Sequence, residues 1–339
     1  MDKNKFITDF SKLGELINEA LQTKIHNDLL TKAEQENKWF SKESILFTLN
    51  ELVNSLSKKK LEDWLSNYQI PPNAMPKLIG LVLAGNIPLV GFHDILCTLA
   101  TGNNILAKLS HKDQVLYTLI KNLLIAIDNE YDKKIIFTTD TLKNIDAIIA
   151  TGSNNSARYF EYYFGKYPNI IRRNRNSVAI IDASFTNTDY KELGKDIFTY
   201  FGLGCRNVSY ILIPDKFDIE ILFRGLEMYE HVIEHNKYAN NYNYQKAILA
   251  MNQIPFYDTG FCLFTENESL NSPIGTIHFG IYKNKTEIEN YVKTHNKEIQ
   301  CIVSKTKYSF KTYSLGMAQK PAFNDYADNI DTVEFLINL

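Results

Sequence analysis

A cysteine on a glycine-rich turn is the residue of this chain best suited to chemistry. Cys205 stands in the stretch 201–210, Phe-Gly-Leu-Gly-Cys-Arg-Asn-Val-Ser-Tyr, between a run with apolar residues at helical spacing and a β-branched run. Gly202 and Gly204 let backbone N–H groups and a substrate approach the thiol closely. Since a thiolate is a strong nucleophile, the turn predicts covalent catalysis by Cys205. The alternative is that Cys205 is a small buried hydrophobic side chain.

Three other turns carry polar groups that suit an oxyanion or a nucleotide. In Ala84-Gly85-Asn86-Ile87-Pro88 the Asn86 amide can donate to a developing oxyanion, although an ordinary helix cap would look the same. Lys108 ends a short strand-like run and can hold a ribose or a phosphate. Gly152 and Ser153, before a helix-like run, can present an N–H and a hydroxyl to a pyrophosphate. No G-x-G-x-x-G follows the first strand-like run, so an ordinary Rossmann fingerprint is absent.

The composition excludes several classes of partner. Hydrophobic residues make up 45% and charged residues 22%, as in soluble globular proteins, and the net charge of -2 provides no basic field for nucleic acid. The most apolar window, 78–92, is too short to span a bilayer and is interrupted by Asn86 and Pro88. We therefore expect neither a nucleic-acid partner nor a membrane span.

Cysteine usage indicates a reducing compartment. Cys97, Cys205, Cys262 and Cys301 show no CxxC pairing and no metal-ligand spacing, and the N-terminus lacks an apolar signal core. We expect no metal site and a cytoplasmic location.

The pattern of apolar residues predicts a helical region followed by a nucleotide-binding domain. Residues 1–76 are predicted to be helical, and Pro71 and Pro72 end this helical region. Residues 77–182 alternate between strand-like and helix-like runs. This alternation predicts right-handed βαβ units, a parallel sheet and ligands at the carboxyl ends of the strands. The expected strands are 77–85, 104–109, 134–138 and 146–150, and the expected helices are 90–100, 113–127 and 153–164.

The second half repeats the alternation and predicts a second α/β lobe. Residues 183–315 form the expected catalytic domain around Cys205. Residues 316–339 return either to the first lobe or to a partner subunit, and the residues leave both options open. The expected strands are 207–214, 261–264, 276–282 and 300–304, and the expected helical segments are 189–200, 217–252 and 287–295.

Taken in order, these motifs resemble the aldehyde dehydrogenase superfamily. The run 84–94, Ala-Gly-Asn-Ile-Pro-Leu-Val-Gly-Phe-His-Asp, together with Lys108-Leu109-Ser110, is similar to its acyl-CoA reductase branch, typified by the fatty-acid reductase of bacterial bioluminescence. The resemblance runs from about residue 37 to the C-terminus. It implies an α/β, aldehyde-dehydrogenase-like fold with a cofactor lobe and a catalytic lobe, each built on a parallel sheet, and an N-terminal helical region.

The resemblance also implies roles for the residues of these turns. Cys205 would be the nucleophile, and Asn86 with the Cys205 backbone N–H would form the oxyanion hole. The expected cofactor-binding residues are Lys108, Ser110, His111, Gly152 and Ser153.

The residue after Lys108-Leu109-Ser110 bears on the choice of cofactor. Many superfamily members place a glutamate there, which holds both ribose hydroxyls and repels a 2′-phosphate, whereas this chain has His111 followed by Lys112. The resemblance therefore implies NADPH in preference to NADH.

Two departures from the family pattern change what the resemblance implies. Arg172 falls about where hydrolytic members keep a catalytic glutamate, and Ser272 or a neighbour falls where many keep a glutamate for the nicotinamide ribose. The first predicts a reductase instead of a hydrolase. The second puts the contacts on the nicotinamide side in doubt.

The function implied is NAD(P)H-dependent reduction of an acyl-CoA, with a fatty acyl group expected, to the aldehyde through an acyl-enzyme on Cys205. Delivery of the acyl group by a carrier protein and assembly into a homo-oligomer stay open. Two alternatives remain: a reductase-like binding subunit without activity, and a reductase of acyl phosphates with the same fold.

Overall fold

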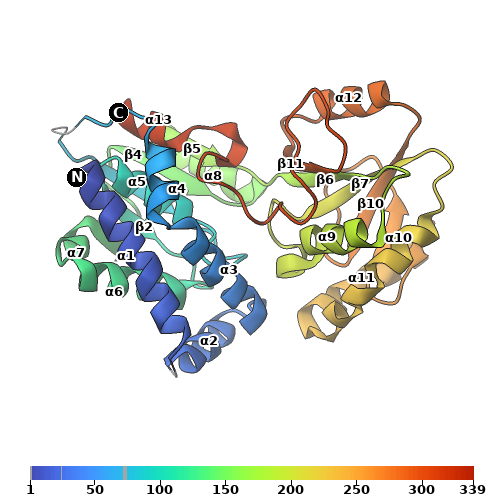
Figure 1. Ribbon diagram of the computed structural model, residues 1–339, viewed down its shortest axis with the longest axis horizontal. Helices are drawn as coiled ribbons and strands as arrows, with labels where there is room; N and C mark the ends of the chain where they lie inside the picture. Colours follow the sequence, from blue (N-terminus) through green and yellow to red (C-terminus); the bar gives the residue numbers. More distant parts are fainter. Residues whose placement is uncertain (1, 24, 72–74) are drawn as a thin grey trace. The chain divides into compact units, whose positions relative to one another are not determined.

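The computed structural model describes residues 2–23, 25–71 and 75–339, so Pro72 lies outside the described residues. The chain divides into two compact units, and Figure 1 labels the α-helices and many of the strands. Unit 1 comprises Met1–Arg173 with Ala322–Leu339, and unit 2 comprises Asn174–Pro321. Among the described helices, none combines the length and the apolar character that a membrane crossing requires.

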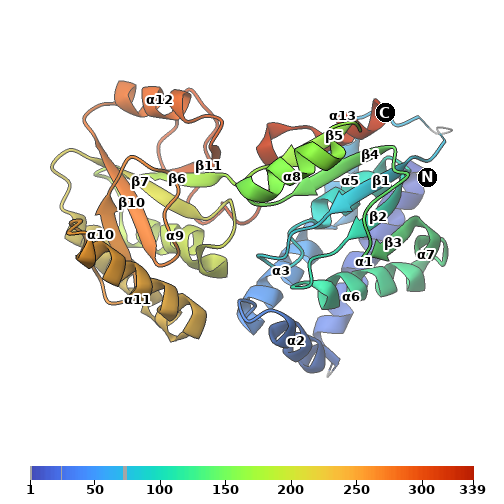
Figure 2. The same ribbon diagram turned by 180° about the vertical axis from the view of Figure 1, so that it is seen from behind.

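Unit 1 is built on a five-stranded parallel sheet with the order β3-β2-β1-β4-β5. The chain lays β2 and β3 on one side of β1 and then returns to lay β4 and β5 on the other side, which makes the carboxyl ends of β1 and β4 the topological switch point of the sheet. Helix α8 contacts β4 and β5 (Figure 2). The strands are β1 Leu78–Val82, β2 Asn104–Lys108, β3 Ile135–Thr138, β4 Ala147–Thr151 and β5 Asn169–Arg172, and the helices among them are α5 Phe92–Ala100, α6 Gln114–Ile127, α7 Glu130–Lys134 and α8 Asn154–Phe164.

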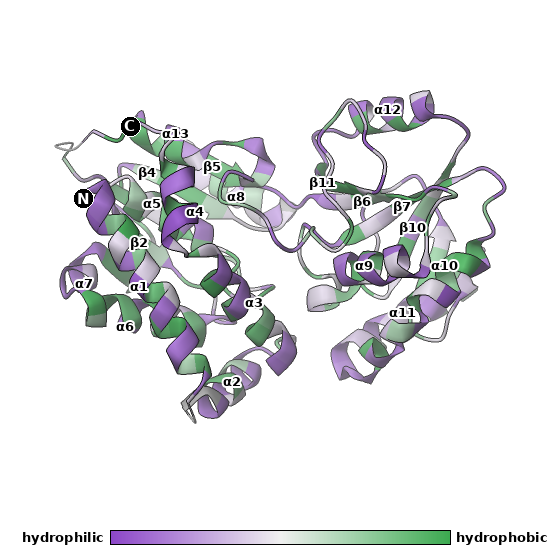
Figure 3. Cartoon of the chain, viewed as in Figure 1, coloured by the Kyte–Doolittle hydropathy of each residue, from purple (hydrophilic) through white to green (hydrophobic). Residues whose placement is uncertain are grey.

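Four N-terminal helices cover part of this unit. They are α1 Lys3–Leu21, α2 Ile25–Glu36, α3 Lys42–Ser55 and α4 Lys58–Leu65. Helix α1 buries Phe6, Phe10, Leu13 and Ile17 to 1% exposure or less, because their spacing places them on one face of the helix. Figure 3 shows α1 as alternating hydrophobic and hydrophilic stretches, as expected of an amphipathic helix.

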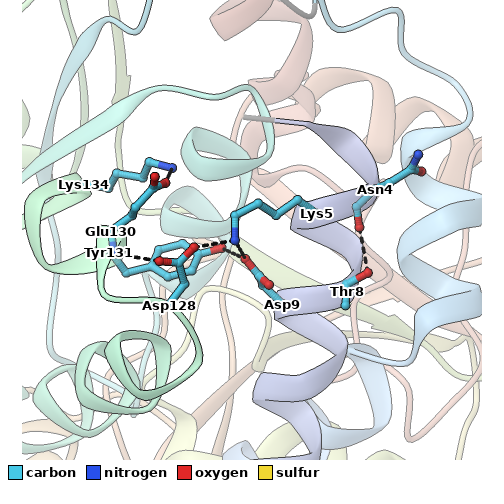
Figure 4. A network of polar contacts seen from close by, with 8 residues as sticks. All are labelled: Asn4, Lys5, Thr8, Asp9, Asp128, Glu130, Tyr131 and Lys134. Atoms are coloured by element: carbon cyan, nitrogen blue, oxygen red, sulfur yellow. Dashed lines mark hydrogen bonds and ion pairs between the residues drawn. The ribbon is translucent and has the colours of Figure 1, made fainter.

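A polar network joins α1 to the α6–α7 corner (Figure 4). Lys5 Nζ pairs with Asp128 and, at 3.0 Å, with Asp9 of its own helix. The Tyr131 hydroxyl, at the buried face of α7, donates to the same Asp9 carboxylate at 2.9 Å. These contacts add to the hydrophobic cluster that α1 shares with α6 and β1, so the helical region packs on unit 1 as part of one core.

Of the C-terminal residues 316–339, those from 322 onward belong to unit 1, which is the first of the two options that the sequence left open, whereas 316–321 belong to unit 2. The elements of 322–339 are η3 Ala327–Asn329 and α13 Thr332–Ile337, and α13 contacts α5. Trp64 Nε1 donates to the Tyr326 hydroxyl at 2.8 Å, which ties this segment to α4.

Unit 2 is built on a six-stranded sheet with the order β11-β6-β7-β10-β9-β8, parallel except for β8, which pairs antiparallel with β9. The strands are β6 Asn176–Ile180, β7 Val208–Pro214, β8 Tyr257–Asp258, β9 Leu263–Glu266, β10 Thr276–Tyr282 and β11 Ile299–Ser304. The helical segments are α9 Asn187–Phe198, η1 Thr199–Gly202, α10 Ile219–Leu226, η2 Glu227–Glu234, α11 Asn236–Met251 and α12 Lys285–Thr294.

The structure differs from the expected boundaries at several places. The first unit ends at Arg173 and not at the expected residue 182, because strand β6 pairs with β7 and β11 and so belongs to unit 2. Pairing partners distant in the chain decide the sheet to which a strand belongs, and local periodicity does not reveal them. Strands β5 and β8 were not expected, β9 lies at 263–266 in place of 261–264, and the helical stretch 217–252 forms three segments.

Candidate active site

The turn that carries Cys205 follows a backbone with left-handed residues. Tyr200, Phe201 and Gly202 have φ angles of 56°, 56° and 78°. A left-handed residue other than glycine costs roughly 1–2 kcal/mol, so packing must hold the two aromatic residues in place. Phe201 stacks on His235 with ring centroids 4.1 Å apart, and Tyr200 is 8% exposed.

Cys205 is the most accessible of the four cysteines. It is partly exposed, whereas Cys97, Cys262 and Cys301 are exposed by 0, 1 and 3%. Burial raises the pKa of the Cys97 thiol well above its usual range and the pKa of the Cys262 thiol to about 12. Because the thiolate is the reactive form, these two buried thiols are poor nucleophiles at neutral pH.

Side chains of unit 2 hold the backbone on both sides of Cys205. The Ser177 hydroxyl, on β6, donates to the Cys205 carbonyl at 3.0 Å. Arg206 Nε donates to the Ala318 carbonyl, and the Arg206 guanidinium lies 4.8 Å from the centre of the Tyr313 ring. Burial lowers the pKa of Arg206, but Cys301, Tyr313 and Cys205 raise it by more, so Arg206 is a permanent cation beside the turn.

Sequence reasoning did not single out Asn207, although it contacts the turn directly. Its side-chain oxygen accepts the Gly204 N–H at 2.8 Å, and the side chain is 2% exposed. The available signal was an amide residue two positions after the cysteine, at the start of a strand. Asn and Asp are common at turns for many reasons, so that signal alone is weak.

In unit 1, Asn86 occupies an exposed bend after β1. Buried groups hold the loop that presents it: Asn37 Nδ2 donates to the Gly85 carbonyl at 3.0 Å, and the Leu89 N–H, at a φ of 52°, donates to Asp113 at 2.7 Å. Burial raises the pKa of Asp113 to about 8, although the Leu89 N–H opposes this rise. The loop is therefore held by buried hydrogen bonds on both sides of Asn86, while Asn86 itself is exposed.

The predicted cofactor residues after β2 lie beside the same loop. Lys108 is exposed and lies in register with Val82, the last residue of β1. A Cβ placed on Gly85 would lie 2.7 Å from Ser110 Oγ, so this close approach requires glycine. His111 is exposed.

Gly152 and Ser153 follow β4 on the other side of β1. Ser153 is exposed and caps α8, accepting the Ser156 N–H at 3.2 Å. A Cβ on Gly152 would meet the Ser156 Cβ at 2.8 Å, so the chain enters α8 by a path open to glycine alone. Since β1 pairs with both β2 and β4, the structure brings Asn86, Lys108 and Ser153 to one edge of one sheet. Cationic groups, a hydroxyl and a helix N-terminus at a switch point fit a phosphate-bearing nucleotide.

Ser272 lines a small cavity in unit 2. The cavity measures about 30 Å³, and Phe198, Phe201 and Tyr238 supply much of its apolar wall.

Arg172 serves a structural role. It is 5% exposed, and its guanidinium bonds the Asp94 carboxylate of α5 at 2.7 and 2.8 Å and the Thr332 hydroxyl of α13 at 3.0 Å. The pKa of Arg172 is raised: burial lowers it, but Asp94 raises it by more. Arg172 therefore cannot act as a general base. Within the described residues, no group of three or more His, Cys, Asp or Glu side chains is arranged to hold a metal ion.

Comparison with solved structures defines the class of fold. The structure aligns with an aldehyde dehydrogenase of Bacillus cereus solved as an NAD+ complex (TM-score 0.67, 13% identity, 91% of this chain and 73% of the other). It also aligns with aldehyde dehydrogenase 21 of Physcomitrella patens (0.69, 11%, 91% and 74%) and with an NAD+ complex of a Mycobacterium tuberculosis aldehyde dehydrogenase (0.68, 11%, 91% and 74%). The fold is that of the aldehyde dehydrogenases.

Comparison with family models and curated proteins identifies one family within this fold. Residues 7–232 match the family model "Acyl-CoA reductase (LuxC)", and the chain belongs to this family. Over 228 residues it is 25% identical to the long-chain acyl-protein thioester reductase 2 of Photobacterium leiognathi, covering 59% of this chain and 47% of that protein. The chain thus spans about half the length of this curated relative. The expected fold and family are confirmed.

Proposed function

We propose that this chain reduces an acyl thioester to an aldehyde with NAD(P)H, through a covalent acyl-enzyme on Cys205. The observation that carries the proposal is that Cys205 is partly exposed on a turn held by side-chain hydrogen bonds, while the other three cysteines are buried. Membership of the acyl-CoA reductase family supports the same reaction class.

In the first step the Cys205 thiolate attacks the acyl carbonyl carbon of the substrate thioester. A sulfur–carbon bond to Cys205 forms, the bond to the substrate sulfur breaks, and the substrate thiol leaves with a proton. One thioester replaces another, so the exchange is nearly isoenergetic. The protein therefore has to favour the thiolate and stabilise the oxyanion. The permanent charge of Arg206 beside the turn suits the first task.

Asn86 is the proposed side-chain donor to the oxyanion, with the Cys205 backbone N–H as the second donor. Asn86 belongs to unit 1 and Cys205 to unit 2, so this pairing stays a prediction carried by the resemblance. What supports it is the exposed position of Asn86 on a loop that hydrogen bonds to Gly85 and Leu89 hold in place.

In the second step the thioester on Cys205 gains a hydride and a proton, which releases the aldehyde and restores the thiol. A bound nicotinamide cofactor would supply the hydride. Lys108, Ser110 and His111 would hold its adenosine ribose, and Gly152 with Ser153 its pyrophosphate. The exposed positions at one sheet edge support these roles, and two of the fold neighbours are described as NAD+ complexes.

NADPH is the proposed cofactor. His111 and Lys112 are both exposed, and the stretch 104–112 contains no carboxylate, so nothing in it repels a 2′-phosphate. A positive charge at Lys112 would attract that phosphate in addition.

An acyl-CoA, with a fatty acyl group, is the proposed substrate. The curated relative is named for acyl-protein thioesters, so an acylated protein is the competing source of the same thioester chemistry. Incubation of the chain with acyl-CoAs of increasing length and with an acylated carrier protein, followed by intact-mass measurement, tests both. An acyl adduct on Cys205 that NADPH removes as aldehyde supports the proposal. Absence of an adduct with every thioester would overturn it.

A further inference from the structure

Asn207 contacts the nucleophile turn with both its backbone and its side chain. The Asn207 N–H donates to the Gly204 carbonyl at 3.0 Å, which closes a β-turn with Cys205 and Arg206 at its centre. The Asn207 side-chain oxygen accepts the Gly204 N–H at 2.8 Å. The same residue therefore holds both polar groups of Gly204.

These two bonds fix the direction of the Cys205 N–H. The peptide between Gly204 and Cys205 is planar and trans, so its N–H points opposite to the carbonyl that Asn207 binds. The Ser177 hydroxyl holds the next carbonyl, that of Cys205 itself, at 3.0 Å. With the carbonyls on both sides restrained, the Cα–Cβ bond of Cys205 has a defined direction.

The side-chain amide nitrogen of Asn207 connects this turn to α9. Its two hydrogens are shared among three carbonyl acceptors, those of Asp196, Ile197 and Thr199, at N···O distances of 3.2, 3.0 and 2.6 Å. Carbonyls in the last turn of a helix lack intrahelical partners, and here a buried amide supplies one. Only a side chain with an acceptor and a donor at this length can bind Gly204 and α9 together.

A buried carboxylate of α9, that of Asp196, connects the helix to the segment 316–318. Asp196, which is 0% exposed, accepts the N–H groups of Gly316 and Ala318 at 2.7 and 2.9 Å. Ala318 in turn accepts from Arg206 Nε, which follows Cys205 directly. The turn is thus held to α9 by Asn207 and to the segment 316–318 by Arg206.

We infer that Asn207 is a positioning residue for the nucleophile: its side chain sets the orientation of the Cys205 thiol and backbone N–H for attack on the acyl carbon. The inference rests on the proposed function for its role in turnover, but its effect on the thiol needs no substrate. A misplacement of about 1 Å in a reacting group can cost roughly 10²-fold in rate.

The test compares Asn207→Ala and Asn207→Asp with a matched control, Thr265→Ala. Thr265 is also buried in unit 2 and donates one hydrogen bond to a backbone carbonyl, that of Pro255 at 2.9 Å, away from the turn. Asn207→Asp keeps an acceptor for Gly204, places a carboxylate oxygen against three carbonyls, and adds a negative charge near the thiol. Two rates are measured: alkylation of Cys205 by iodoacetamide across pH, read at the peptide level, and single-turnover acylation by an acyl-CoA. The melting temperature of each variant is also measured, so that a difference in rate is not mistaken for a difference in stability.

We expect single-turnover acylation of Cys205 to be about 10²-fold slower in both Asn207 variants than in Thr265→Ala, and the alkylation midpoint of Asn207→Asp to move to higher pH. Reaction of both variants at the control rate, with an unchanged midpoint, would overturn the inference. Failure of the wild-type chain to take an acyl group would contradict the proposed function alone, because the alkylation result stands without it.

A measurement on the wild-type chain covers the case in which the variants do not fold. The Gly204 amide hydrogen should exchange slowly with solvent because Asn207 binds it. Fast exchange of that hydrogen, in a chain whose β7 amides are protected, would also overturn the inference.

Discussion

Arg172 and Asp94 form a buried ion pair in which one guanidinium nitrogen, Nη1, donates to both carboxylate oxygens at 2.8 and 2.7 Å. Their side chains are 6 and 5% exposed. The pair joins the end of β5 to α5, and Thr332 extends it to α13. Arg172, which the resemblance predicts to lie at about the position of the family's general base, thus links three elements of unit 1.

Loss of this arginine should destabilise unit 1. Arg172→Met leaves the Asp94 carboxylate buried and unpaired, which costs about 3–5 kcal/mol in the free energy of unfolding. The neighbouring Arg173 offers a control, because its pair with Glu161 is exposed (54 and 48%) and such pairs contribute roughly 0–1 kcal/mol. Urea unfolding measures both. A loss in Arg172→Met no larger than in Arg173→Met would contradict this reading.

The acyl-enzyme on Cys205 should persist in the absence of a reduced cofactor. Hydrolysis needs a general base, Arg172 cannot accept a proton, and 173–176 contain no carboxylate. Since a positioned base contributes about 10²- to 10⁴-fold in rate, the adduct should be visible after minutes. Intact mass after stopped incubation with acyl-CoA measures it. Rapid release of free fatty acid without a lasting adduct would refute the reductase assignment.

Of the four cysteines, only Cys205 should be required for chemistry. Cys205→Ala should abolish both acyl transfer and reduction, because it removes the nucleophile. Cys97→Ala, Cys262→Ala and Cys301→Ala each remove a buried sulfur and should lower the free energy of unfolding by about 1 kcal/mol while the adduct still forms. Mass spectrometry of each variant after exposure to acyl-CoA distinguishes these outcomes. A covalent adduct on Cys205→Ala would show that the nucleophile lies elsewhere.

His111→Glu should shift cofactor preference from NADPH towards NADH. A carboxylate near a 2′-phosphate adds roughly 1 kcal/mol of repulsion at an exposed site, or about a fivefold loss in kcat/KM for NADPH. The ratio of kcat/KM values for the two cofactors measures the shift, with His111→Gln as the uncharged control. Equal or better turnover of the wild-type chain with NADH at matched concentrations would oppose the NADPH assignment.

Asp113 should make stability depend on pH near neutrality. Burial raises its pKa from 3.8 to about 8 in the folded chain. Between these values the folded chain holds a proton that the unfolded chain releases, so the free energy of unfolding falls as pH rises, by about 1.4 kcal/mol per pH unit at most. The fall ends above pH 8, where both states are ionised.

Asp113→Asn removes this ionisation and keeps an oxygen that can accept the Leu89 N–H. The variant should therefore be more stable than the wild type at pH 8 but not at pH 4, as measured by urea unfolding at both pH values. Asp140→Asn, at an exposed position, is the control and should change neither value. A stability difference for Asp113→Asn that is the same at both pH values would exclude ionisation of Asp113 as the cause.

The sequence alone could predict the strand ends at which Asn86, Lys108 and Ser153 lie. Apolar runs of strand length identify strands, and parallel strands bring their carboxyl ends to one edge whatever the packing details. The glycine-rich turn of Cys205 could also be predicted from the sequence, because its glycines and the change of periodicity lie within ten residues. The fold and the family followed from the order of these local motifs.

The tertiary structure alone decided the contacts between residues distant in the chain. It placed β6 in the second sheet, bound Arg172 to a carboxylate 78 residues earlier, and returned α13 to unit 1. It also turned Asn207 into a tie between Gly204 and the end of α9. The residue types alone permit many hydrogen-bond and ion-pair partners for each polar side chain. The packing of the whole unit selects one of them, because a buried polar group must bind a partner that the fold places beside it.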